Sequence, residues 1–142
     1  MPHSFSCKVY YEDTDLQGIV YHANYLRFIE RARTEALEAY GIDQTDLIER
    51  DGLMFVVRRI EADYLQPARF GDTLEVETRV ASVGAASLVM SQEVRRSGRA
   101  LFRANVSVAV ISRDGRPSRM PDAMRQILRT KNQSSEPRTH SL

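Results

Sequence analysis

Residues 12–40, EDTDLQGIVYHANYLRFIERARTEALEAY, join a short loop rich in carboxylates to a long amphipathic segment. From residue 24 onward, apolar side chains recur every three or four positions, which predicts a helix over 24–40 with one buried face. Asn24 is a candidate N-cap for this helix, and Gly41 supplies the left-handed residue that ends it. A short helical turn is expected next, over 44–50.

The rest of the chain follows a period of two, which is typical of strands with one buried face. Strands are expected at 5–11, 53–65, 72–83, 87–96 and 99–112. The connections between the last four strands are short, at 66–72, 83–87 and 97–98. Connections of this length are typical of hairpins, so these four strands are predicted to form an antiparallel meander.

The order of one strand, one long helix and four strands predicts an α+β fold. A helix is expected over 121–130, opened by Pro121, and a disordered tail over 131–142, which lacks an apolar face. Residues 1–130 are therefore expected to form one domain. One helix covers only one face of a curved sheet, so a second copy is expected along a sheet edge.

The composition is that of a small globular protein. Its 142 residues are 42% hydrophobic and 27% charged, which suffices for a core without disulfides or metal. Cys7, the single cysteine, lies in an alternating run and is expected to be buried, which favours a reducing compartment. No apolar run reaches the roughly 18 residues of a membrane-spanning helix, and no signal peptide is visible. The protein is therefore expected to be cytoplasmic.

The net charge of +1 conceals a division along the chain. Residues 1–94 carry 9 basic and 16 acidic side chains, a balance of −7, whereas residues 95–142 carry 11 basic and 3 acidic ones, a balance of +8. Most of the basic groups are arginine, whose fork binds phosphate oxygens in pairs. A phosphate-bearing partner and a merely solvated basic edge are both open. Nucleic acid is not expected, because no recognition module is visible.

Asp15 lies nine residues before the expected helix start, in a loop that Gly18 closes. The segment 19–23 then leads to the helix N-terminus, whose free N–H groups carry partial positive charge. A carbonyl oxygen placed there is polarised, and a carboxylate across it either attacks the carbonyl or deprotonates a water. This arrangement suits a thioester and needs neither metal nor cofactor. The alternative is that Asp15 only bonds its own backbone in a turn.

The other polar residues near this loop have less specific interpretations. Glu12 and Asp13 are expected to be turn residues. His22 is open to three interpretations: a base, a ligand or a loop residue. His3, His22 and His140 show no metal-ligand spacing, so no metal site is expected.

The segment YEDTDLQGIVYHANYLRFIERAR resembles the signature of the hotdog-fold acyl-CoA thioesterases, specifically the YbgC-like branch beside 4-hydroxybenzoyl-CoA thioesterase. The matching pieces are D-T-D-x-x-G-I-V-Y-H-x-N-Y at 13–25, F-I-E-x-A-R at 28–33 and D-Y-L-Q-P-A-R-F-G-D at 63–72. With the strand order, the resemblance covers about residues 5–128. It implies a hotdog fold, in which a five-stranded antiparallel sheet wraps a long central helix. It also implies a homodimer with one continuous sheet, usually paired again into a homotetramer.

The resemblance further implies active sites at the dimer interface. Asp15 matches the catalytic carboxylate, which acts as nucleophile or as general base. The backbone N–H at His22 matches the donor that polarises the thioester carbonyl, and the His22 side chain is expected to line the acyl pocket or to hold a water.

Other positions in the signature are expected to contact substrate. Glu30 matches a carboxylate that holds a ring hydroxyl in the benzoyl-type enzyme. Here it binds a polar acyl end, or it pairs with Arg27 or Arg33. The remaining expected contacts in this region are Gly18, Val20, Tyr21 and Asn24.

A CoA thioester would give the arginines a role, because CoA carries a diphosphate and a ribose phosphate. Arg58 and Arg59 on the strand 53–65 are candidates, as is Arg95, which clusters with Arg96 and Arg99 at the Ser97-Gly98 hairpin.

The expected function is hydrolysis of a short-chain, hydroxyacyl or aromatic acyl-CoA to the free acid and CoA. One alternative is a docking partner of acyl carrier protein or of a lipid enzyme, which would use the basic C-terminal third. A hotdog dehydratase is a further alternative, but it commonly needs a histidine base and an acid, and His22 lies in a different motif.

Overall fold

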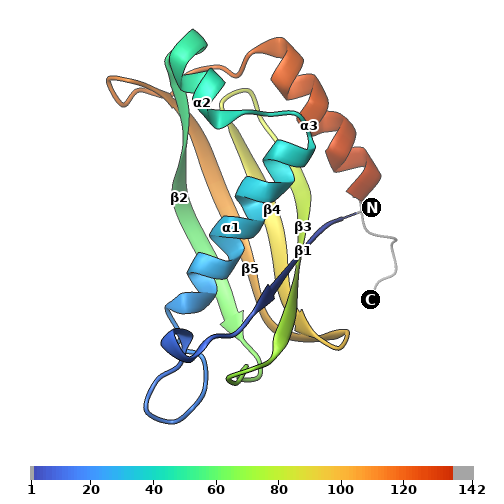
Figure 1. Ribbon diagram of the computed structural model, residues 1–142. Helices are drawn as coiled ribbons and strands as arrows, with labels where there is room; N and C mark the ends of the chain where they lie inside the picture. Colours follow the sequence, from blue (N-terminus) through green and yellow to red (C-terminus); the bar gives the residue numbers. More distant parts are fainter. Residues whose placement is uncertain (1, 136–142) are drawn as a thin grey trace.

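The computed structural model of the protein describes residues 2–135 and consists of a five-stranded antiparallel sheet with one long helix across one face (Figure 1). In chain order its elements are β1 (His3–Lys8), η1 (Tyr11–Asp13), α1 (Asn24–Ala39), α2 (Gln44–Asp46), η2 (Leu47–Asp51), β2 (Leu53–Tyr64), β3 (Thr73–Val83), β4 (Ser87–Arg96), β5 (Arg99–Ser112) and α3 (Asp122–Ser135). This order confirms the predicted α+β fold. The prediction of a tail over 131–142 was wrong for 131–135, which continue α3; residues 136–142 lie outside the described residues.

Helix α1 forms where the apolar period predicts it. Its buried residues are Tyr25, Phe28, Ile29, Ala32, Ala36 and Leu37. Gly41, with φ of 87°, follows the helix and lets the chain turn back, as predicted. The predicted N-cap was wrong, because Ala23 occupies that position without a side-chain hydrogen bond. Asn24 Nδ2 instead donates to the Asp13 carbonyl at 2.9 Å, so this side chain ties the helix start to the preceding loop.

The sheet order is β1-β3-β4-β5-β2, with every neighbouring pair antiparallel. The predicted meander is confirmed for β3, β4 and β5. It was wrong for β2, which pairs with β5, whereas β3 pairs with β1. The connection between Tyr64 and Thr73 therefore crosses between strands that are not neighbours. It passes the loop of residues 12–23, named the carboxylate loop here, to which it is bridged at Ile19 and Arg69. Ser97 and Gly98 have φ of 53° and 79°, which fits the predicted two-residue hairpin between β4 and β5.

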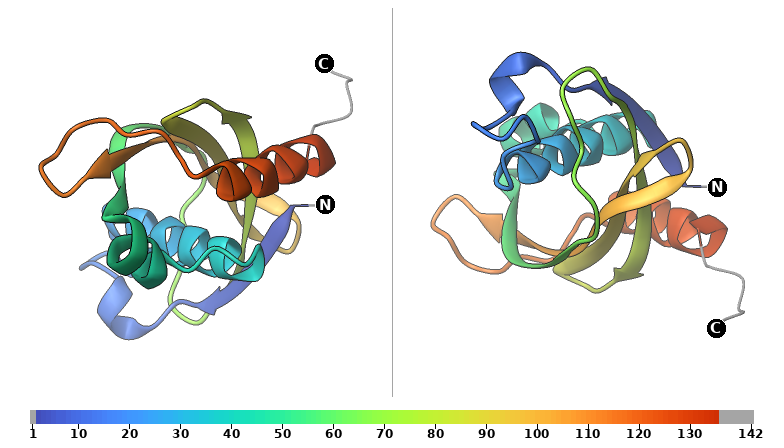
Figure 2. Two further views of the ribbon diagram at one scale, coloured as in Figure 1. Left: turned by 90° about the horizontal axis from the view of Figure 1, so that it is seen from above. Right: turned by 90° about the horizontal axis from the view of Figure 1, so that it is seen from below.

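The core lies between α1 and the sheet, which curls around the helix (Figure 2). Phe28 and Ile29 from α1 meet Phe102 and other buried strand residues in one cluster. Met124 and Leu128 of α3 join the same cluster, and α3 packs beside β3. Cys7 is half-buried and packs against this core, so it is less buried than expected.

Across residues 2–135, none of the helices combines the length and apolar composition that crossing a membrane requires.

Strand β2 is left partly uncovered on the side that faces the core. Val57, Ile60 and Tyr64 pair with the buried residues Val108, Val106 and Phe102, so both members of each pair have their side chains on the same face. The three β2 side chains are nevertheless 42%, 36% and 50% exposed, respectively. Helix α1 packs mainly against β1, β3 and β4. The fold therefore leaves an apolar strip open along its long edge strand.

Candidate active site

The carboxylate loop is a narrow hairpin. Thr14 and Val20 form an isolated antiparallel bridge, and the Asp15 N–H donates to the Ile19 carbonyl at 2.9 Å. The Gly18 N–H donates to the Asp15 carbonyl at 3.0 Å, and Gly18 has φ of 80°, which favours glycine. Asp15 therefore lies at the start of a tight, hydrogen-bonded turn.

The Asp15 carboxylate is exposed and only partly engaged. Its Oδ1 accepts a hydrogen bond from the Gln17 N–H at 2.8 Å, which is the turn contact that the alternative interpretation required. Among the described residues, no donor meets the second oxygen. The turn contact and a chemical role are compatible, because the first oxygen sets the direction of the carboxylate while the second stays available.

The loop is fastened to the crossing segment that joins β2 to β3. The Val20 N–H donates to the Ala68 carbonyl at 2.8 Å, and Ile19 forms an isolated bridge with Arg69. The Ala68 N–H donates to the buried phenol oxygen of Tyr25 at 2.9 Å. Helix α1, the crossing segment and the carboxylate loop are thus one hydrogen-bonded unit.

The crossing segment is in turn anchored by Asp72. Its Oδ2 accepts from the Arg69 N–H at 2.8 Å and from Arg96 Nη1 at 2.7 Å. Burial opposes ionisation of Asp72, but the hydrogen bonds from Arg69 and Arg96 and their charges outweigh it and lower the pKa of this carboxyl. Asp72 is therefore an ionised anchor that joins the crossing segment to the end of β4.

The helix entry presents unused donors. Within residues 2–135, the N–H groups of His22 and Ala23 have no acceptor, whereas the Asn24 N–H donates to the Tyr21 carbonyl at 2.8 Å. The His22 carbonyl accepts from the Tyr64 hydroxyl at 2.9 Å, which fixes the orientation of this peptide. Free N–H groups at a helix start carry partial positive charge and can stabilise a developing oxyanion.

One open cavity, of about 890 Å³, contains much of the predicted site. Its lining includes the predicted residues Asp15, Gly18, Tyr21 and Asn24. Tyr11 and Phe70 border the same cavity, with their rings edge to face at 6.3 Å. Leu16 in its lining is fully exposed, as are large parts of the two aromatic rings. The cavity is thus an acidic centre surrounded by uncovered apolar surface.

Val20 and His22 border a second, smaller cavity of about 280 Å³ with Tyr25 and Tyr64. Val20 is 3% exposed and belongs to the core, so it is the Val20 backbone that positions the loop. The His22 ring is exposed and lies 4.6 Å from the Tyr21 ring and 6.2 Å from the Tyr64 ring.

Glu30 lies apart from both cavities, in a pocket between α1 and the sheet. The alternative role for Glu30, an ion pair with Arg27 or Arg33, is not formed in the described part of the chain; Arg33 donates instead to Gln92.

The arginines predicted to bind a nucleotide do not line the Asp15 cavity. Arg59 pairs with Glu61 at 2.8 Å, and Arg95 pairs with Glu93 at 2.7 Å. Arg58 lies at a β-bulge, between two residues that pair regularly with β5, and is exposed. In the described structure it has no ion pair, so its charge is the least neutralised of the three.

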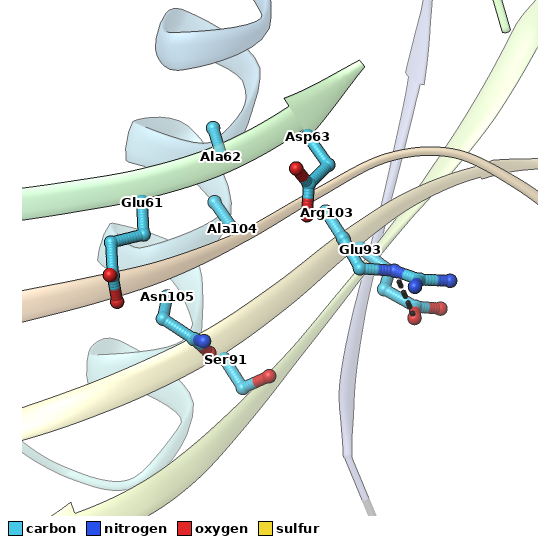
Figure 3. Close-up of a pocket in the computed structure, with 8 residues that line it drawn as sticks. All are labelled: Glu61, Ala62, Asp63, Ser91, Glu93, Arg103, Ala104 and Asn105. Atoms are coloured by element: carbon cyan, nitrogen blue, oxygen red, sulfur yellow. Dashed lines mark ion pairs between the residues drawn. The ribbon is translucent and has the colours of Figure 1, made fainter. Parts of the chain in front are cut away.

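A further pocket, of about 570 Å³, lies on the sheet face away from α1 (Figure 3). It is formed by polar side chains of β2, β4 and β5, among them Glu61, Asp63 and Asn105. Arg103 and Glu93 pair across its floor at 3.5 Å. Because its charges are partly paired with one another and its lining holds none of the predicted residues, we do not place the chemistry there.

Residues that sequence reasoning missed include Tyr64, Tyr25 and Asp72. Each lies in a segment already singled out by its motif, but its hydrogen-bond partner is 42, 43 or 24 positions away. No local pattern indicates such a contact.

Comparisons with known proteins identify the family of this chain. The model of the thioesterase superfamily matches residues 17–102. Acyl-CoA thioesterase YbgC of Haemophilus influenzae is 45% identical over 108 residues, which are 76% of this chain and 79% of that protein.

Solved structures of other proteins share the fold of this chain. A probable thioesterase from Bartonella henselae is 38% identical, with a TM-score of 0.82 over 85% of this chain and 100% of its own. A Staphylococcus aureus protein in complex with CoA has a TM-score of 0.91 over 99% of this chain and 90% of its own; at 13% identity it shows the fold alone. The expected hotdog fold is confirmed, and this chain is a thioester hydrolase that belongs to the thioesterase superfamily.

Proposed function

We propose that this protein is an acyl-CoA thioesterase in which Asp15 is the catalytic carboxylate. The observation that carries the proposal is that two features follow one another along a single loop. Asp15 has an exposed carboxylate with one oxygen held by the Gln17 N–H. The loop that carries it runs directly into a helix entry where the His22 and Ala23 N–H groups have no acceptor among the described residues.

The chemistry follows from these groups. A thioester carbonyl that accepts from the His22 or Ala23 N–H becomes more electrophilic, and the same donors stabilise the oxyanion as it forms. Asp15 then either attacks the carbonyl carbon, which gives an anhydride that water hydrolyses, or takes a proton from an attacking water. In both routes the thiolate leaves and the free acid is released. Tyr64 supports one of these donors, the Ala23 N–H, because the His22 carbonyl that it holds belongs to the same peptide group.

CoA is the proposed thiol because of two kinds of support. The curated relative from Haemophilus influenzae is named an acyl-CoA thioesterase, and the fold neighbour from Staphylococcus aureus was solved with CoA. In this chain Arg58 is exposed and without an ion pair in the described residues, so we favour it over Arg59 and Arg95 as a phosphate contact.

We further propose that the active unit is a homodimer joined along β2, itself paired into a homotetramer. Strand β2 is a 12-residue edge strand, and long unpaired edges are usually covered by another chain. The apolar strip of Val57, Ile60 and Tyr64 along it is uncovered in a single chain. A second copy would cover this strip beside the helix entry, and would thereby exclude water from the thioester.

The test is release of free thiol from a panel of short-chain, hydroxyacyl and aromatic acyl-CoAs by the full chain. We expect turnover of at least one class, with the free acid as the other product. If a folded oligomer hydrolyses none of them, the proposal is wrong. Hydrolysis of acyl carrier protein thioesters alone would move the substrate from CoA to the carrier protein.

A further inference from the structure

We propose that Asn24 is a positioning residue for thioester hydrolysis: its side-chain amide fastens the turn that carries the proposed oxyanion donors to the arm of the carboxylate loop that carries Asp15. The inference rests on the proposed function and adds to it a residue that acts through other groups. It gives Asn24 a role different from the helix cap and the substrate contact that its sequence position predicts.

The proposed donors lie in a β-turn. The Asn24 N–H donates to the Tyr21 carbonyl at 2.8 Å, which closes the turn. His22 and Ala23 are its two central residues, and in the described part of the chain their N–H groups have no acceptor. Ala23 has φ of −70° and ψ of −20°, so the turn leads directly into α1. The direction of the free N–H groups therefore depends on how the turn is held.

Both ends of this turn are fastened to one oxygen, the backbone carbonyl of Asp13. Asn24 Nδ2 donates to it at 2.9 Å, and the Tyr21 N–H donates to it at 2.9 Å. A carbonyl oxygen has two lone pairs, so these two bonds use its full capacity. Asp13 is itself held, because its Oδ2 accepts from the Tyr10 N–H at 2.8 Å. The turn is therefore attached to a fixed point of the loop.

Asp15 lies on the same arm of the loop, two residues after Asp13. The Asp15 N–H donates to the Ile19 carbonyl at 2.9 Å, so the backbone of Asp15 is held as well. Asn24 and Asp15 line one cavity. The Asn24 side chain is thus a short link between the carboxylate and the donors, the two groups that must act on one thioester carbonyl.

Hydrolysis depends on the relative position of these two groups. A carbonyl oxygen that accepts from the turn must leave its carbon within reach of Asp15, or of the water that Asp15 deprotonates. A misplacement of about 1 Å in such an arrangement costs on the order of a hundredfold in rate. A side chain that holds the turn to the loop therefore contributes to the rate without touching a reacting atom.

The fold does not depend on the Asn24 side chain. Without its amide, the Asp13 carbonyl still accepts from the Tyr21 N–H, and the bridge between Thr14 and Val20 remains. Asn24 is half-buried, so water can take the place of the amide on the carbonyl. We therefore expect variants at Asn24 to fold, with the turn less firmly held against the loop.

The test begins with Asn24→Leu, which has a similar volume but no donor, and uses the acyl-CoA that the wild type turns over fastest. We expect kcat to fall about ten- to a hundredfold, KM to stay within about threefold and the melting temperature to stay within a few degrees. Asn24→Asp keeps the shape of the side chain but loses the donor at pH 7, so it should lose kcat as well. Asn105→Leu is the matched control and should match the wild type, because Asn105 is exposed on the sheet face away from α1.

A double-mutant cycle with Asp15→Asn separates positioning from a merely structural role. If Asn24 acts by setting the relation between the carboxylate and the donors, Asn24→Leu should cost less than about threefold further once Asp15 is replaced. A structural contact would cost the same factor in both backgrounds, and that result would overturn the role of Asn24. Wild-type kcat in folded Asn24→Leu or Asn24→Asp would also overturn it and leave the thioesterase proposal standing. Hydrolysis of no acyl-CoA by the wild type would overturn both.

Discussion

The hydroxyl of Tyr64 donates a hydrogen bond of 2.9 Å to the carbonyl oxygen of His22, so the end of β2 holds the peptide that precedes α1. The rings of the same two residues lie edge to face, 6.2 Å apart. The edge strand that we propose as the dimer contact is therefore directly linked to the proposed oxyanion donors. In the proposed dimer, assembly would therefore be coupled to the orientation of the proposed oxyanion donors.

Replacing Tyr64 with Phe tests this link. The change removes only the hydroxyl, so the His22 peptide loses one hydrogen bond worth about 1 kcal/mol. We expect kcat to fall up to about tenfold with little change in KM, because the donors act mainly on the transition state. Steady-state kinetics and a thermal melt measure both effects. Tyr10→Phe, at an exposed tyrosine outside the cavities described, should match the wild type. An unchanged kcat in Tyr64→Phe would remove this residue from the account.

The Asp72–Arg96 pair should stabilise the fold in a manner that depends on pH. The folded pKa of Asp72 is lowered relative to its ordinary value of 3.8. Its stabilisation is therefore complete above about pH 5 and is lost as the pH falls below about 4 towards the folded pKa. We expect Asp72→Asn to lower the free energy of unfolding by about 1–2 kcal/mol at pH 7 and by much less at pH 3.

Urea unfolding at both pH values measures this difference. Asp114→Asn is the control, since Asp114 also pairs with an arginine, Arg116, but both side chains are largely exposed. It should change the free energy of unfolding little at either pH. A cost for Asp72→Asn that does not diminish at pH 3 would contradict the ionised anchor.

The buried amide of Gln92 should be important for stability. Gln92→Leu fills a similar volume but leaves Arg33 and Thr78 without their partner. We expect the free energy of unfolding to fall by about 2 kcal/mol, the cost of unsatisfied buried polar groups. Ser91→Ala, the neighbouring position on the opposite face of β4, should cost under about 0.5 kcal/mol. Equal values for the two variants would mean that the hydrogen bonds of Gln92 contribute little.

The open strip on β2 should be a contact between two copies. We expect light scattering at micromolar concentration to give at least twice the chain mass of 16.2 kDa. Ile60→Asp places a charge in the strip and should shift the mass towards that of one chain. Ile48→Asp, at an equally exposed apolar residue near the other end of β2, should leave the mass unchanged. A wild-type protein with the mass of one chain would exclude the dimer.

Local periodicity was enough to predict α1 and the four long strands, because apolar side chains recur along one face of each, even in β2, where a single chain leaves part of that face uncovered. It did not predict the partner of β2. A connection as short as 65–72 allows a hairpin, and only the pairing of β1 with the free side of β3 rules it out. Asn24 shows the same limit, since a residue that suits an N-cap instead reaches Asp13, 11 positions back.

In the candidate site, too, features formed by neighbouring residues could be predicted from the sequence, whereas contacts between distant residues could not. The loop of Asp15 and Gly18 was visible because its residues are adjacent in the chain. Arg33 was noted only as a possible ion-pair partner for Glu30, since its bond to Gln92 spans 59 positions. The arginines were chosen by charge alone, and two of the three are paired with carboxylates that follow or precede them by two residues.

Thiol release by the wild type and by Asp15→Asn, with the acyl-CoA that the panel shows to be turned over fastest, tests the role of Asp15 most directly. Asparagine keeps the turn contact to the Gln17 N–H but can neither attack a carbonyl nor accept a proton. We predict that the variant folds with the wild-type melting temperature within a few degrees and loses at least about a hundredfold in kcat. A folded Asp15→Asn enzyme that keeps most of its turnover would contradict the assignment of Asp15 as the catalytic carboxylate.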